Sequence, residues 1–183
     1  MPTIFISPST QEYNPYIGGG NEEYYTNLIA DAIAPYLRCA GIQFARNNPE
    51  LRVCGSVNAS NSGNYDLHLA IHSNTAPENL SGQLQGIDVY YFTGSAKGKR
   101  VAEIIAKNLK LIYPYPDLVE TVPTTQIYEL NTTRAPAVFV ELGYHDNTDD
   151  AEWITSNIER IAQNLVLSLS QYFDISFASL NNT

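Results

Sequence analysis

The most informative stretch for the fold is Leu67-His68-Leu69-Ala70-Ile71-His72-Ser73-Asn74. Its first five residues are apolar except for His68, and such a continuous run is typical of a strand buried on both faces of a sheet. Polar residues follow at once, beginning with His72. The stretch therefore predicts an interior strand that ends in a polar segment at the edge of a sheet.

Similar apolar runs alternate with helical stripes along the rest of the chain. Strands are predicted over residues 3–7, 42–45, 67–71, 87–92 and 137–140, and helices over 21–37, 55–62, 95–112 and 149–172. Strands separated by helices indicate a mostly parallel sheet that is covered on both faces. The predicted fold is an α/β three-layer sandwich, a mostly parallel twisted sheet with helices on both faces. A single domain is expected over 1–175, followed by a C-terminal tail over 176–183.

Composition and charge limit the classes of function. The chain has 183 residues, of which 44% are hydrophobic and 16% charged, and its net charge is −9. This acidity argues against a nucleic-acid partner, and no stretch approaches the roughly 20 apolar residues of a membrane span. Because Met1–Ile6 has no basic residue and is a short apolar run, it does not resemble a signal peptide. We expect a monomer that does not insert into membranes and stays cytoplasmic until it is released or exported by another route.

Polar side chains follow three of the predicted strands. They lie in the segments Ser7–Gln11, His72–Asn74 and Glu141–His145, and Glu23 comes from the junction between the first segment and the next helix. In sheets of this kind function gathers beyond the carboxyl ends of the strands. Carboxylate and imidazole ligands meeting there suit a zinc ion with an open position for water. Glu141 follows four apolar residues, where a carboxylate is costly unless it is paired or functional.

The order of these segments resembles the zinc-dependent N-acetylmuramoyl-L-alanine amidases of the type-three class, from Ile4 to about Phe173. In that family a Glu opens a helix four residues before an Asn, a strand ends in a Ser-Ile-His-x-Asn-like motif, and a later strand delivers a Glu. The matching residues here are Glu23 with Asn27, Ala70-Ile71-His72-Ser73-Asn74, and Pro136-Ala137-Val138-Phe139-Val140-Glu141 with Tyr144 and Asn147. The resemblance implies that Glu23 and His72 bind zinc and that Glu141 is the catalytic base.

The chain departs from the family at the first motif, where Thr10 stands in the place of the first zinc-binding histidine. Three replacements are open, namely Gln11, Glu12 and His145, and a fourth possibility is a site that binds metal weakly or not at all. Imidazole and carboxylate suit zinc better than an amide does, but position favours Gln11 as the third metal ligand. His68 lies about 13 Å from His72 at ~3.3 Å per residue, so it is expected to be a buried, hydrogen-bonded histidine.

The implied function is zinc-dependent hydrolysis of the amide bond between N-acetylmuramic acid and L-alanine in peptidoglycan. The expected partner is therefore a peptidoglycan muropeptide, and the expected cofactor is Zn2+. Two alternatives remain from the sequence. One is an amidase-fold module that binds peptidoglycan after losing its chemistry with the first histidine, and the other is a metal hydrolase acting on another acylated peptide.

Overall fold

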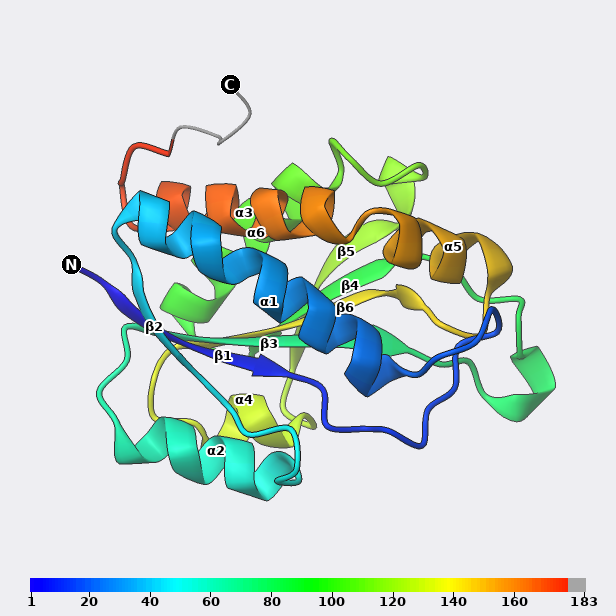
Figure 1. The fold of residues 1–183 in the computed structure, drawn as a ribbon, viewed down its shortest axis with the longest axis horizontal. Helices are drawn as coiled ribbons and strands as arrows, with labels where there is room; N and C mark the ends of the chain where they lie inside the picture. Colours follow the sequence, from blue (N-terminus) through cyan, green and yellow to red (C-terminus); the bar gives the residue numbers. More distant parts are fainter. Residues whose placement is uncertain (178–183) are drawn as a thin grey trace.

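A six-stranded sheet runs through the centre of the protein in a computed structural model that describes residues 1–177 (Figure 1). The strand order is β2-β1-β3-β6-β4-β5. All neighbouring pairs are parallel except β4 with β6, which is antiparallel. The strands are β1 (Thr3–Pro8), β2 (Gln43–Arg46), β3 (Leu67–Asn74), β4 (Ile87–Phe92), β5 (Val119–Thr124) and β6 (Ala137–Tyr144). The mostly parallel sheet predicted from the sequence is confirmed.

Helices cover both faces of this sheet, which confirms the predicted three-layer arrangement. Figure 1 shows α1, α3, α5 and α6 on one face and α2 and α4 on the other. The helices are α1 (Glu22–Ala40), α2 (Val53–Ser62), α3 (Ala96–Leu109), α4 (Tyr128–Thr132), α5 (Thr148–Ser156) and α6 (Ile158–Tyr172). Two short 3-10 helices, Glu78–Leu80 and Pro116–Leu118, lie in the connections.

Three elements differ from the sequence-based prediction. Strand β5 and helix α4 were not predicted, because each is short and carries no clear apolar period. The single helix predicted over 149–172 is two helices that meet at Asn157. The Asn157 side chain donates a hydrogen bond to the Trp153 carbonyl, and its own carbonyl accepts from the Ile161 amide, so this residue ends α5 and starts α6.

The two faces of the sheet are packed unequally. The larger apolar core lies between the sheet and the helices α1, α3, α5 and α6, with fully buried residues such as Ile33, Ile105 and Leu165. The smaller cluster, on the side of α2 and α4, consists of Ala70, Leu130, Ala137 and Phe139. Because the two short helices cover less of their face, this side has room for a pocket and for polar side chains.

The register of the central strands aligns the predicted polar segments. Strands β1, β3 and β6 are direct neighbours, and His72 on β3 is the partner of Glu141 on β6. Glu141 is in turn the partner of Asp88 on β4, which enters the sheet from the same end because it runs antiparallel. Side chains two residues apart share a face of a strand, so these three residues lie on the face that carries Ala70 and Phe139.

The C-terminal boundary stays a prediction. Of the expected tail, 176–183, only Ser176 and Phe177 are among the described residues. The ring of Phe177 packs edge-on against Tyr36 of α1, with 6.4 Å between ring centroids. Within residues 1–177 no helix combines the length and the apolar character that a membrane crossing needs.

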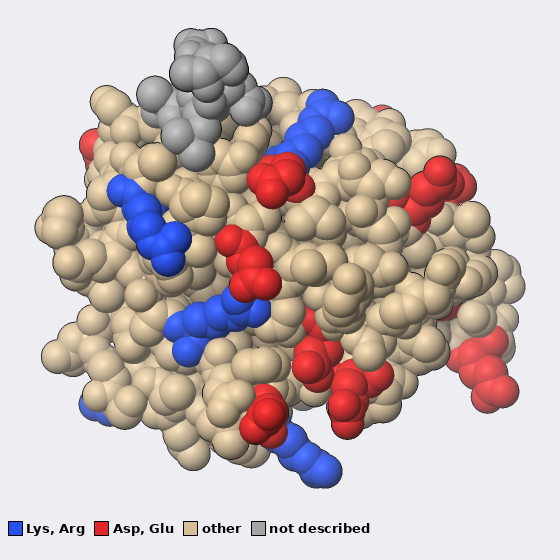
Figure 2. All heavy atoms as spheres, in the orientation of Figure 1, with Lys and Arg blue, Asp and Glu red and all other residues tan. Residues whose placement is uncertain are grey.

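Acidic side chains dominate part of the surface. Figure 2 shows several of them toward the lower right of this face, over the region where Figure 1 draws the loop after β1 and the start of α1. Basic side chains are scattered more widely on the same face. On this face, several acidic side chains therefore lie near the edge of the sheet where the polar segments end.

Candidate active site

His72 is the centre of the candidate site. It is buried at the end of β3, and its ring stacks on Phe139 with 4.2 Å between ring centroids. Its Nδ1 atom lies 2.8 Å from Glu22 Oε1, and its Nε2 atom lies 3.3 Å from Glu129 Oε2. Burial alone would lower the pKa of His72, but the hydrogen bonds to Glu129 and Glu22 outweigh it and raise the pKa to about 10.

Glu22 reaches His72 from the first turn of α1. Asn21 caps this helix by accepting a hydrogen bond from the Tyr24 amide. The Glu22 carboxylate is almost fully buried, and its Oε2 atom accepts a hydrogen bond of 2.6 Å from the Asn14 side chain. Burial would raise the pKa of Glu22, but the hydrogen bond and charge of His72 hold it below its usual value.

Gln11 is the third side chain at the Nδ1 side of His72. Its Nε2 atom lies 3.5 Å from His72 Nδ1, and its Oε1 atom accepts hydrogen bonds from the side chains of Tyr13 and Asn14. In this orientation the amide nitrogen faces His72, and the amide oxygen would reach a metal there only after a flip of the side chain that gives up its hydrogen bonds from Tyr13 and Asn14. The Gln11 amide thus lies at the same ring nitrogen as the Glu22 carboxylate.

Glu141 lies beside His72 on the neighbouring strand. Its Oε2 atom is buried and has no hydrogen-bond partner among the described residues. Burial raises the pKa of Glu141 to about 8, with further contributions from the charges of Glu22 and Asp88, while His72 acts in the opposite direction. An unpaired buried carboxylate oxygen is costly, so this atom is a candidate for a functional role.

Glu129 completes a buried network behind His72. Its Oε1 atom accepts hydrogen bonds from Ser7 Oγ at 2.5 Å and from His68 Nε2 at 3.1 Å. The other ring nitrogen of His68 lies 3.0 Å from Ser60 Oγ. Burial opposes ionisation of Glu129, but the hydrogen bonds from His68 and His72 hold its pKa well below the usual range.

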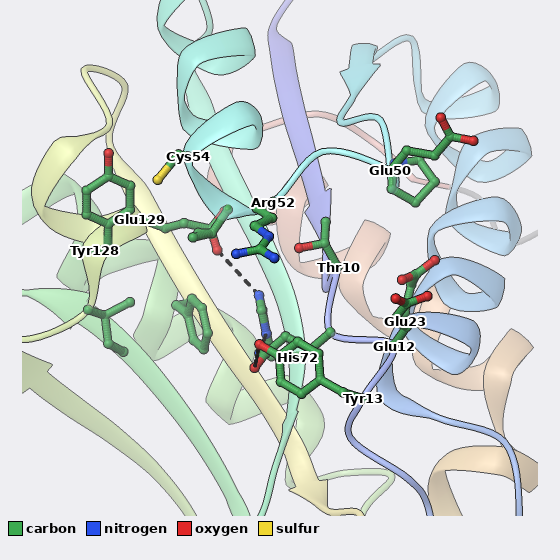
Figure 3. A pocket seen from close by; sticks show the side chains of 15 residues that line it. Thr10, Glu12, Tyr13, Glu23, Glu50, Arg52, Cys54, His72, Tyr128 and Glu129 are labelled. Atoms are coloured by element: carbon green, nitrogen blue, oxygen red, sulfur yellow. Dashed lines mark hydrogen bonds and ion pairs between the residues drawn. The ribbon is translucent and has the colours of Figure 1, made fainter.

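A pocket of about 840 Å³ opens onto these residues. Figure 3 shows Glu129 and His72 pointing toward one another in its floor, with Tyr128 and Cys54 on one wall. Glu12 and Glu23 lie together on the opposite wall, and the other residues that line the pocket include Thr10, Gln11, Glu50, Arg52 and Phe139. This volume is within the range of pockets that bind small molecules or short peptides.

The structure brings some of the predicted residues together and separates others. Gln11, His72 and Glu141 lie in one region, but the carboxylate that contacts His72 is Glu22 and not the predicted Glu23. Glu23 lies on the pocket wall, where burial and the nearby charge of Glu12 raise its pKa. The apolar positions Ile29 and Ile33 lie 7 and 11 residues after Glu22, so extending their helical stripe backwards would have selected it.

Neither alternative third ligand lies at Nδ1 of His72. Glu12 is on the wall beside Glu23 (Figure 3), and His145 stacks on Tyr16 while its Nδ1 atom lies 3.0 Å from Ser73 Oγ. Within residues 1–177, no three His, Cys, Asp or Glu side chains form a group that could hold a metal ion. His68 is buried and hydrogen-bonded, which confirms that prediction. Glu129 was missed, because nothing in the short segment around it distinguishes it.

Comparison with known proteins identifies the family of the chain. Residues 4–171 match the Amidase_3 family, described as N-acetylmuramoyl-L-alanine amidase. The chain belongs to this amidase family. Membership confirms the family and the fold that the sequence predicted. Dependence on zinc is typical of this amidase family.

Individual amidases are similar to the chain at different levels. The N-acetylmuramoyl-L-alanine amidase CwlM of Bacillus licheniformis is 30% identical over 123 residues, which are 66% of this chain and 46% of that protein. The chain thus spans about half the length of this curated relative. The amidase AmiC2 of Nostoc punctiforme has a TM-score of 0.80 at 19% identity, over 94% of this chain and 97% of that one. The catalytic domain of the amidase CwlV from Bacillus (Paenibacillus) polymyxa var. colistinus has a TM-score of 0.80 at 18% identity, over 96% and 100%.

The donor atoms around His72 Nδ1 fit the divalent metal typical of the family. One imidazole nitrogen, one carboxylate oxygen and one side-chain amide converge there. Zinc binds imidazole and carboxylate well and an amide oxygen poorly. The unpaired Oε2 atom of Glu141 lies next to this set, as expected for an acid that faces a cation or a water molecule.

Proposed function

We propose that this chain hydrolyses the amide bond between N-acetylmuramic acid and L-alanine in peptidoglycan, acting at the bacterial cell wall as a monomer. The observation that carries the proposal is the unpaired buried oxygen of Glu141 beside the pair formed by Glu22 and His72. An acid, an imidazole and a second carboxylate at the floor of a pocket are the components that metal-assisted hydrolysis requires. Family membership supplies the substrate class.

Glu22 and His72 would hold the zinc ion, with Gln11 as the third ligand. Glu22 takes the place of Glu23, because only Glu22 contacts His72. When bound, zinc supplies the Lewis acidity that activates water and polarises an amide carbonyl. A set with one imidazole and one amide is a weaker donor set than two imidazoles and a carboxylate, so we expect lower zinc affinity than a site with the missing histidine would have.

Glu141 would transfer the proton during hydrolysis. It would accept a proton from the attacking water as the new C–O bond forms, and then donate it to the alanine nitrogen as the C–N bond breaks. The products are the muramic acid carboxylate and a free α-amino group on the peptide. Burial raises the pKa of Glu141, which favours a group that accepts a proton and then donates it.

The direct test is the release of free amino groups from purified peptidoglycan. Wild-type protein supplied with zinc should release peptides whose N-terminal residue is alanine, detected by amine labelling and mass spectrometry. Glu141→Gln should reduce turnover by about 10²- to 10⁴-fold, the usual contribution of a positioned acid or base, and should still bind zinc. The exposed Glu103→Gln on α3 is the matched control and should keep full turnover.

Two results would contradict the proposal. Turnover that survives in Glu141→Gln would remove the proposed base. Binding of insoluble peptidoglycan without any release of amino groups, even with zinc supplied, would support the binding module instead. Release of amino groups from other acylated peptides, but not from peptidoglycan, would support a metal hydrolase with a different substrate.

A further inference from the structure

Glu129 makes contacts that a purely structural residue would not need. Its carboxylate is 1% exposed and comes from α4, a helix of five residues. Its Oε1 atom accepts hydrogen bonds from two buried donors, Ser7 and His68, and its Oε2 atom lies 3.3 Å from a third buried partner, Nε2 of His72. Replacing a buried ionic group by an apolar side chain is often neutral or stabilising, so the fold alone does not explain why a carboxylate stands here.

The contact with His72 has a specific chemical effect. A neutral imidazole carries one N–H and one lone pair, and the hydrogen bond at one nitrogen determines which of the two stays free. An ionised carboxylate only accepts hydrogen bonds, so Glu129 keeps the proton of His72 on Nε2. Glu22 likewise accepts from Nδ1 in the structure, so a metal ion held between Glu22 and His72 would take the place of the Nδ1 proton while Glu129 holds the proton on Nε2.

The rest of the network holds Glu129 itself in place. Ser7 belongs to β1 and His68 to β3, so hydrogen bonds from two neighbouring strands of the sheet hold the carboxylate in place. Ser60 of α2 in turn contacts the second ring nitrogen of His68. With Ser7 and His68 bound to Oε1, the Oε2 atom is directed at His72 (Figure 3).

We propose that Glu129 is a positioning residue that orients His72 and strengthens it as a metal ligand, in a site that has only one imidazole. This inference rests on the proposed metal site of the amidase. A carboxylate hydrogen-bonded to a metal-binding histidine fixes the ring and raises its basicity. Strengthening the single imidazole offsets the weak third ligand, Gln11, that replaces the missing histidine.

The test compares zinc affinity in Glu129→Gln and wild-type protein by competition with a chromophoric chelator. The glutamine has the same size but is a weaker, neutral acceptor, so zinc affinity should fall by about 10- to 100-fold. The control Glu103→Gln makes the same change on the exposed surface of α3 and should stay within about twofold of wild type. In zinc-loaded protein, the Nε2–H proton of His72 should also move upfield by NMR in Glu129→Gln, because its hydrogen bond is weaker.

Turnover separates positioning from a direct catalytic role. At zinc concentrations above the weakened Kd, Glu129→Gln should regain most of the wild-type turnover, whereas the loss of a reacting group would persist. If Glu129→Gln does not fold, Glu129→Asp keeps the charge on a shorter side chain and should show a smaller loss of zinc affinity.

The inference and the proposed function fail in different ways. Unchanged zinc affinity in a folded Glu129 variant, or turnover that excess zinc does not restore, would overturn the inference and leave the amidase activity standing. A protein that shows the expected loss of affinity but releases no amino groups from peptidoglycan would keep the inference and overturn the activity. No zinc binding by the wild type would overturn both.

Discussion

Glu22 and Glu23 are adjacent in the sequence and occupy different environments. Each residue of an α-helix is turned by about 100° from the last, so one carboxylate enters the space beside His72 and the other lies on the pocket wall. Burial of Glu22 is tolerated because His72 and Asn14 donate hydrogen bonds to it. A rotation of one residue along the helix therefore decides which of the two acids faces the metal site.

A pair of matched variants tests this distinction. Glu22→Gln should weaken zinc binding by more than the roughly 10- to 100-fold expected for a supporting residue, because it removes a proposed ligand. Glu23→Gln should leave zinc affinity within about twofold of wild type, since a partly exposed charge at a distance has little effect. Isothermal titration with zinc measures both. Equal losses in the two variants would show that Glu23 is a ligand after all.

Among the helices and strands, two connecting segments near the candidate site are joined by hydrogen bonds. Asp146, in the turn between β6 and α5, accepts hydrogen bonds from the amides of Ala76 and Gly82 and from the Ser81 hydroxyl. These contacts tie the connection between β3 and β4 to the end of β6. Burial would raise the pKa of Asp146, but the hydrogen bonds from Gly82, Ala76 and Ser81 hold it below its usual value.

This anchoring predicts a pH-dependent stability difference. Because the pKa of Asp146 is lower in the folded than in the unfolded state, its stabilisation is present above the unfolded pKa of about 3.9 and is lost as the pH falls through the folded value. Asp146→Asn should lower the free energy of unfolding at pH 7 by about 1 kcal/mol, allowing for partial exposure. Urea unfolding of both proteins at several pH values measures the difference. It should shrink below about pH 4, and a constant difference would rule out the charged hydrogen bonds as its cause.

In the whole molecule, one face of the sheet holds the main apolar core and the other face holds the pocket. The face covered by α1, α3, α5 and α6 holds the main apolar core. The face under α2 and α4 carries the pocket, His72, Glu129 and Glu141. The polar groups of the candidate site are thereby concentrated on one side, while apolar burial on the other side supplies most of the stability.

The division predicts where substitutions destabilise the protein. Leu165→Ala on α6 should lower the free energy of unfolding by about 2–5 kcal/mol, the usual effect of emptying a packed core position. Val53→Ala, at the partly exposed rim of the pocket, should change it by less than about 0.5 kcal/mol. Urea denaturation of the two variants checks this contrast. Similar losses in both would mean that the pocket side contributes as much to stability as the core.

Local sequence patterns predicted the layered α/β fold and the edge of the sheet that carries the candidate site. Alternating apolar runs and helical stripes report which residues are buried, and the polar residues after the runs at Ile71 and Val140 mark the carboxyl ends of two central strands. The sequence also identified His72, Glu141 and Gln11, which lie in one region of the structure. These predictions rest on the spacing of apolar residues and on the polar residues that follow them. Both can be seen in the sequence without knowing which segments pack together.

The contacts of Glu22 and Glu129 with His72 follow from the tertiary structure and not from any local sequence pattern. The contact of Glu22 with His72 depends on the angle at which α1 packs on the sheet, and that of Glu129 depends on the path by which α4 returns to pack against β6 and β4. Ser7, His68 and Glu129 are separated by 61 residues or more along the chain. No local period encodes such distances, because long-range hydrogen bonds follow from the order of the strands and the packing of the helices on them.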